Sequence, residues 1–224
     1  MERILRAGPG WADGVADALR LAPRPIPLDE RLLARGPDGE VTRAKYDRAT
    51  FPPARPAATL LVIYPDDEGR LVIPVTVRHA DMRDHAGEVS LPGGTVDPSD
   101  VSREAAALRE AWEEIGLEPD LVRIVGVLDD VWIPVSNFEL RPFVGTVSER
   151  PMLVPHDAEV ASIVELPLAA LFDPDVLGTE EFRSARGFTV SAGAYRYGGV
   201  RVWGATAFTL GMLAHVLEGA AAGA

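Results

Sequence analysis

The chain has 224 residues, of which 47% are hydrophobic and 25% charged, and this suits one globular domain with an appendage. It contains no cysteine, which excludes disulfides, thiolate metal sites and a cysteine nucleophile. The net charge of −12 lies mostly in residues 57–224, which argues against a nucleic-acid partner.

The amino-terminal residues, MERILRAGPGWADG, do not have the charged start and apolar run of a secretory signal. We expect that no apolar run approaches the length of a membrane span. We therefore expect a cytoplasmic protein without a membrane partner.

Residues 12–21 predict a short helix, and the proline- and glycine-rich stretch after it predicts an irregular arm. We accordingly divide the chain into an N-terminal helix and arm, residues 1–56, and a main domain, residues 57–224. The arm could wrap the domain, pair two subunits or stay mobile. A homodimer is therefore one expectation.

The start of the main domain predicts a β-hairpin. Residues 57–64 are a continuous apolar run typical of a buried strand, and residues 70–77 predict a second strand after a turn. Residues 86–94 predict a short strand that ends in a Pro-Gly-Gly loop.

Residues 103–115 give the clearest helix, with Ser99 or Ser102 as its N-cap and Gly116 at its C-terminal end. The later segments predict a mixed sheet covered by helices, an α/β fold. These segments are strands at 121–128, 139–147, 161–166, 187–197 and 200–204 and a closing helix at 205–222.

The predicted helix 103–115 places Glu110, Glu113 and Glu114 on one side. We expect another stripe, with the same helical spacing, to face the core. Its members are Ala105, Leu108, Trp112 and Ile115.

Like charges at this spacing destabilise a helix, and a hard divalent cation with oxygen ligands compensates for them. Mg²⁺ or Mn²⁺ is the cofactor that the pattern indicates. The alternative is a solvated acidic face in which Arg109 pairs with Glu113, and the three glutamates alone favour that alternative. The loop before the helix, LPGGTVDPSD, changes the balance, because its glycines let backbone amides approach a ligand such as phosphate.

Together the loop and helix resemble the box of the Nudix hydrolases, a glycine, an acidic residue and then Arg-Glu-x-x-Glu-Glu-x-Gly. Two departures are the aspartate after the glycine and a glycine-to-arginine spacing of 15 positions where the family usually has 14. The matching residues are Gly94, Asp100, Arg109, Glu110, Glu113, Glu114 and Gly116.

Both departures are similar to the coenzyme A pyrophosphatase branch of that family, which also has a signature ahead of the box. His79 and Leu91 depart from that signature, and the combined match covers residues 75–117. The residues that match the signature are Thr76, Arg78, Arg83, Gly87, Pro92, Gly93 and Gly94.

The resemblance implies an α/β/α sandwich with a mixed sheet between helices. It implies that Glu110, Glu113 and Glu114 hold the metal, and that Arg109 orients a glutamate or forms a simple surface ion pair. Asp100 is either an outer residue of the site or a helix cap.

The resemblance also implies that Arg78 and Arg83 grip the phosphates of coenzyme A, including its 3′-phosphate, while Gly93 and Gly94 approach metal and phosphate. Glu159 lies where many members carry an acidic residue and is a candidate general base, although an exposed glutamate is the plainer interpretation. For Trp203 we expect a place in the core, with stacking on adenine as the alternative.

The implied activity is metal-dependent hydrolysis of coenzyme A or an acyl form to 3′,5′-ADP and 4′-phosphopantetheine or its acyl derivative. One alternative is another nucleoside diphosphate derivative, such as ADP-ribose, NADH or a dinucleoside polyphosphate. A second is a Nudix-fold sensor that binds a nucleotide without cleaving it.

Overall fold

In a computed structural model, the chain is described at residues 6–79, 87–156, 158–183, 187 and 189–222. Helix α1, Trp11–Leu21, confirms the first predicted helix. The arm that follows contains three short 3₁₀ turns, η2 (Glu30–Leu32), η3 (Thr42–Lys45) and η4 (Arg48–Thr50).

The arm packs onto the rest of the chain throughout its described part. Ile26 and Leu32 are buried in the larger apolar cluster. Arg24 forms an ion pair of 2.6 Å with Asp129, and the backbone amide of Arg35 donates to the carbonyl of Ser191. The described residues of the arm therefore wrap the domain, which was one of the three alternatives.

The central sheet begins with the predicted hairpin, strands β1 (Arg55–Pro65) and β2 (Leu71–Arg78). Strand β7 (Phe138–Thr146) pairs in parallel with β1 along nine residue pairs, whereas the other pairings are antiparallel, so the sheet is mixed. Its remaining strands are β3 (Val89–Ser90), β4 (Gly93–Thr95), β5 (Arg123–Val127), β6 (Val131–Ile133) and β8 (Val160–Pro167).

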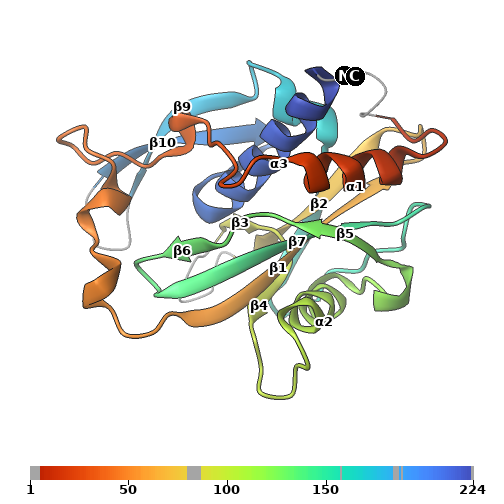
Figure 1. Cartoon of the computed structure of the whole chain (residues 1–224), viewed down its shortest axis with the longest axis horizontal. Coiled ribbons are helices and arrows are strands. Elements are labelled where there is room, and N and C mark those ends of the chain that lie inside the picture. Colours follow the sequence, from red (N-terminus) through yellow and green to blue (C-terminus); the bar gives the residue numbers. More distant parts are fainter. Residues whose placement is uncertain (1–5, 80–86, 157, 184–186, 188, 223–224) are drawn as a thin grey trace.

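Helices cover both faces of this sheet, which confirms the α/β/α sandwich (Figure 1). Side chains alternate along β1, so Leu60 and Val62 join the apolar cluster under α2 (Arg103–Ile115). Leu61 and Ile63 join the larger cluster on the other face, which includes side chains of α1 and of α3 (Gly204–Ala222). Because β1 is buried on both faces, it has the continuous apolar sequence from which it was predicted.

Strands β9 (Leu177–Arg183), β10 (Thr189–Tyr197) and β11 (Val200–Val202) form a separate three-stranded sheet. Strands β10 and β11 were predicted, but a sheet of their own was not. Strand β9 was missed because its sequence, LGTEEFR, is polar and has no clear alternation, and β6 because it has only three residues. Each forms a strand because it pairs with a strand that follows it in the sequence, β9 with β10 and β6 with β7.

The predicted core stripe of α2 was partly wrong. Trp112 is 50% exposed, while Ile115 is fully buried as expected. The residues that face the sheet with Ile115 are Ala106, Ala107 and Ala111. Two stripes satisfy the helical spacing, and the alanine stripe is the buried one because small side chains let the helix lie close to β1.

Helix α3 also differs from expectation. With a mean hydropathy of 1.2 it is long and apolar enough to cross a membrane by length and composition, so the statement that no run reaches this length was wrong. In this fold 56% of that segment is buried, and α3 supplies side chains to the larger apolar cluster. Packing against the sheets accounts for its apolar sequence.

Candidate active site

Local signals place both ends of helix α2. The hydroxyl of Ser102 accepts a hydrogen bond of 3.0 Å from the amide of Ala105, so Ser102 is the N-cap. Ser99 instead donates its amide and hydroxyl to Asp97. At the other end Gly116 has a φ of 66°, a left-handed conformation that favours glycine.

The two glycines of the Pro-Gly-Gly loop begin strand β4, which pairs with β1 in antiparallel orientation. The carbonyl of Pro92 accepts hydrogen bonds from the amide of Leu60 and from the hydroxyl of Thr59. A Cβ on Gly93 would lie 2.5 Å from the carbonyl oxygen of Ala58, closer than atoms can pack. Glycine is therefore required here by the close approach of two backbones.

Two carboxylates of α2 lie against the two glycines of this loop. The amide of Gly93 donates to the Glu114 carboxylate at 3.3 Å. A Cβ on Gly94 would lie 2.5 Å from the Oε1 atom of Glu110. The structure thus brings Glu110, Glu114, Gly93 and Gly94 together, as the resemblance implied.

Glu113 has a different environment from the other two glutamates. Its side chain is 48% exposed and accepts a hydrogen bond of 2.7 Å from Arg109. Within the described ranges, no three acidic or histidine side chains are close enough together to hold a metal ion as they stand. The set of three glutamates as metal ligands remains a prediction, and the geometry favours Glu110 and Glu114 over Glu113.

Arg109 connects the helix to the loop. Its guanidinium donates two hydrogen bonds of 3.0 Å to Asp100, and others to Glu110, Glu113 and the carbonyl of Thr95. Asp100 does not cap the helix; it pairs with Arg109, and this hydrogen bond lowers the pKa of its carboxyl. Arg109 accordingly orients Glu110 and is more than a surface ion pair.

The pKa of Glu114 is raised to about 7, first because its carboxylate is buried and also because Glu110 and Glu159 are negative. The Gly93 amide and the charge of Arg78 act in the opposite direction. Burial also raises the pKa of Glu110. Two adjacent carboxylates that are costly to ionise fit a hard divalent cation, whose charge would offset that cost.

Arg78 lies at the end of β2, close enough for its charge to act on Glu114. The pairing of β2 with β8 shifts register between Val77 and Arg78, an irregularity that can re-aim a side chain. The Nε atom of Arg78 is buried and has no hydrogen-bond partner among the described residues. Such an orphaned donor suits an anionic ligand. Arg83, its predicted companion, lies outside the described residues.

Glu159 lies beside the same carboxylates. It is exposed, and its negative charge raises the pKa values of both Glu110 and Glu114. The carbonyl of Glu159 accepts from the amide of His79, so the β8 end is held next to the β2 end. This position agrees with the implied one, and the role of general base stays a prediction.

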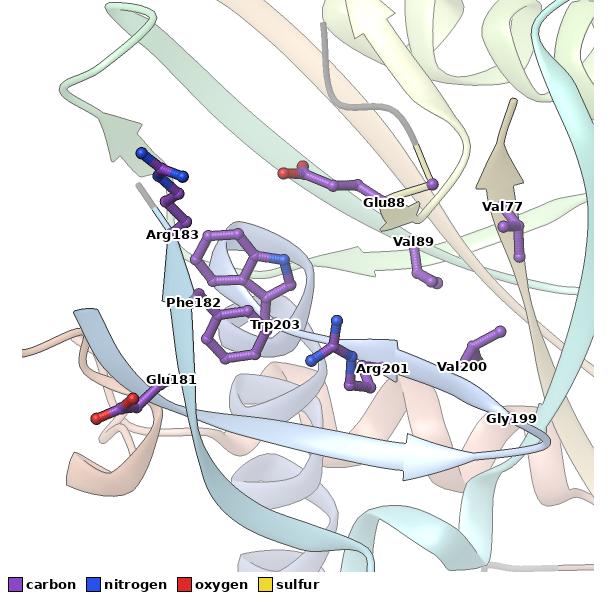
Figure 2. Close-up of a pocket in the computed structure, with 11 residues that line it drawn as sticks. Val77, Glu88, Val89, Glu181, Phe182, Arg183, Gly199, Val200, Arg201 and Trp203 are labelled. Carbon is purple, nitrogen blue, oxygen red and sulfur yellow. The ribbon is translucent and has the colours of Figure 1, made fainter. Parts of the chain in front are cut away.

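The structure also contains a cavity of about 470 Å³ that sequence analysis did not find (Figure 2). It lies between the ends of β2 and β3 and the three-stranded sheet. The rings of Phe182 and Trp203 stack in it with centroids 4.2 Å apart and planes within 5°. Trp203, expected in the core, is partly buried against a small apolar cluster and also lines this cavity. Phe182, Arg183 and Arg201 gave no local signal, because they come together only through strand pairing.

Comparisons with known proteins show which sequences and structures this chain is similar to. A model of the NUDIX domain matches residues 53–186. The uncharacterized Nudix hydrolase NudL of Cronobacter sakazakii is 38% identical over 65% of this chain, and that of Citrobacter koseri is 45% identical over 42%. The match spans 71% and 49% of those two relatives' lengths. Among solved structures, the Nudix hydrolase RenU of M. Smegmatis gives a TM-score of 0.43 at 22% identity, covering 63% of this chain and 82% of RenU.

Proposed function

The chain belongs to the Nudix family, and on that premise we propose that it hydrolyses the pyrophosphate bond of coenzyme A or an acyl-coenzyme A. Water would add to one phosphorus atom, the bridging P–O bond would break, and the second phosphate would leave. The products are 3′,5′-ADP and 4′-phosphopantetheine or its acyl derivative.

The observation that carries the proposal is the contact between two carboxylates and a glycine backbone. Glu110 and Glu114 are held against Gly94 and Gly93, with the guanidinium of Arg109 fixing Glu110 from one side. This arrangement places the carboxylate oxygens beside the glycine backbone, where we expect a pyrophosphate and its cation to bind.

Glu110 and Glu114 are the residues that would hold Mg²⁺ or Mn²⁺, with Glu113 as an additional ligand. When bound, such an ion neutralises phosphate charge and lowers the pKa of a coordinated water. Arg78 would bind a phosphate oxygen through its orphaned Nε, since a guanidinium meets phosphate with directed hydrogen bonds. Glu159, exposed and beside both carboxylates, would accept a proton from the attacking water.

The preference for coenzyme A is supported by the signature ahead of the box. Thr76 is buried, and its hydroxyl hydrogen-bonds to the carbonyl of Ser90, so it fixes β3 beside β2 and does not face a substrate. That pairing sets the path from Arg78 to the Pro-Gly-Gly loop. Of the signature residues, Arg78, Gly93 and Gly94 lie next to Glu110 or Glu114, and this supports the proposal.

The test is mass spectrometry of products after incubation of the pure protein with coenzyme A, with and without Mn²⁺. Appearance of 3′,5′-ADP and 4′-phosphopantetheine only with metal supports the proposal. The double variant Glu113→Gln/Glu114→Gln should lose this rate, and an unchanged rate would contradict the catalytic assignment. If coenzyme A stays intact, turnover of ADP-ribose, NADH or a dinucleoside polyphosphate would indicate another substrate, and binding without turnover a sensor.

A further inference from the structure

The cavity of about 470 Å³ shown in Figure 2 is lined by residues that lie outside the Nudix box. Its floor is the stacked pair Phe182 and Trp203, a preformed aromatic surface. Strands β2 and β3 supply Val77 and Val89 on the opposite wall. Flat aromatic surfaces of this kind bind nucleobases by stacking, and any base can stack because every base has a π-face.

Two guanidiniums flank the aromatic surface. Arg201 lies over the Phe182 ring at 5.5 Å and is held there by an ion pair of 3.0 Å with Glu180. Arg183 lines the same cavity; its backbone belongs to the pairing of β9 with β10, and its side chain forms no hydrogen bond or ion pair with the described residues. In Figure 2 the two side chains lie on either side of the stacked rings. Paired arginines beside an aromatic ring suit a phosphate that is attached close to a base.

Two carboxylates, Glu88 and Glu181, also line the cavity, and the side chain of Glu88, just before β3, extends toward the rings in Figure 2. A carboxylate accepts hydrogen bonds from the exocyclic amine of a base such as adenine. Charged groups of both signs are costly to bury against an acyl chain. The lining therefore favours a nucleotide over a lipid-like group.

The cavity and the paired glutamates meet at the end of β2. Val77 lines the cavity, and the next residue, Arg78, acts on Glu114. Neighbouring residues of a strand point to opposite sides, so a ligand that reaches both places passes around the strand end. A molecule with a pyrophosphate between two long arms has the shape for this path.

We propose that this cavity binds the nucleoside end of the substrate, with the base on Trp203 and a phosphomonoester of its ribose between Arg183 and Arg201. The inference rests on the proposed function and deepens it. It assigns the 3′-phosphate of coenzyme A to these two arginines and leaves the pyrophosphate to Arg78. The binding surface so defined consists of two segments that lie 93 positions apart in the sequence, Val77 to Val89 and Phe182 to Trp203.

The first experiment measures binding without any metal. Isothermal titration compares 3′,5′-ADP with 5′-AMP on the wild-type protein and on Arg183→Gln, Arg201→Gln and Trp203→Leu. We expect each arginine variant to weaken 3′,5′-ADP about tenfold and to leave 5′-AMP almost unchanged, and Trp203→Leu to weaken both ligands about tenfold. Equal affinity of the wild type for the two ligands, or unchanged affinity in both arginine variants, would overturn the proposal.

Arg196→Gln is the matched control. Arg196 belongs to the same sheet and pairs with the same Glu180, yet it does not line the cavity. Its variant should bind both ligands as the wild type does. A loss equal to that of Arg201→Gln would mean that disturbance of Glu180, and not loss of a phosphate contact, explains the result, and the proposal would fall.

A kinetic experiment separates this inference from the proposed function. With Mn²⁺, the ratio of kcat/KM for coenzyme A to that for 3′-dephospho-coenzyme A should fall about tenfold in Arg183→Gln, through KM and not kcat. If the wild type hydrolyses coenzyme A and the variant keeps the ratio, the cavity assignment fails and the proposed function stands. If the wild type hydrolyses neither substrate, the proposed function fails, and the metal-free titration still decides the cavity.

Discussion

The α2 face and the α3 face of the central sheet are assembled from the chain in different ways. On the α2 face, one continuous stretch, residues 93–116, supplies the glycine loop, the paired carboxylates and the arginine that orients one of them. On the α3 face, the cavity of Figure 2 forms where the ends of β2 and β3 meet the three-stranded sheet. The proposed metal ligands are therefore encoded in one short stretch, whereas the proposed surface for the rest of the substrate depends on segments far apart in the chain.

The first way to test this contrast is to replace Glu114 by Gln, which should lower kcat on the order of a hundredfold, because a metal ligand stabilises transition-state charge by several kcal/mol. Thermal stability should stay the same or rise, since burial disfavours the charged carboxylate and the amide oxygen of Gln still accepts from Gly93. Steady-state kinetics and calorimetry measure the two effects.

Two other glutamates serve as comparisons for Glu114. Glu113→Gln should cost less activity, because that side chain is 48% exposed and bonded to Arg109. Glu118→Gln, an exposed change just beyond the helix, should leave activity intact. Equal losses of activity in the Glu113→Gln and Glu114→Gln variants would show that both carboxylates take part in the reaction. That result would contradict the geometry, which favours Glu114.

The second prediction separates the two glycines of the loop. Gly93→Ala should destabilise the fold by about 1–3 kcal/mol, because the new methyl group would overlap backbone atoms of β1. Gly94→Ala would meet only the flexible end of Glu110, so it should reduce activity with little loss of stability. Denaturant unfolding and kinetics on both variants measure this. The reverse assignment of effects would mean that β4 does not lie on β1 as described.

The third prediction concerns the connection between loop and helix. Arg109→Gln should reduce kcat about tenfold, since Glu110 and the Asp100 turn would lose their common donor while the paired carboxylates remain. Arg109→Lys should restore little, because a lysine cannot reproduce the two parallel hydrogen bonds to Asp100. Full activity of the lysine variant would show that Arg109 contributes only its positive charge.

Sequence patterns predicted helix α2, its end at Gly116 and the shared side of its glutamates, because these follow from helical spacing and turn chemistry. The approach of the glycine pair to Glu110 and Glu114, 16 to 21 positions away in the sequence, was implied only by the family resemblance. The buried stripe of α2 was misassigned because Ala111 and Trp112 both satisfy that spacing, and only the distance to β1 decides between them. Strand β9 and the stack of Phe182 on Trp203 were not predictable, because they depend on strand pairing across the chain.

The smallest expected effect lies where the arm joins the sheet. Hydrogen bonds from Arg48, and then from Arg103, lower the pKa of Glu139 below its usual 4.5. A lowered pKa contributes stability that is complete above about 4.5 and is lost as the pH falls through the folded-state value. Because Arg48 is 57% exposed, this contribution is at most about 1 kcal/mol.

Glu139→Gln should accordingly lower the free energy of unfolding at neutral pH by at most about 1 kcal/mol, and the difference from wild type should be smaller at an acidic pH below the usual pKa of 4.5. Urea unfolding at both pH values measures it, with Arg48→Gln and the double variant completing a cycle that isolates the pair. Activity at neutral pH should not change, since Glu139 lies away from the paired glutamates. A loss of activity would mean that the arm acts on the catalytic face as well, and the two faces would then not be independent.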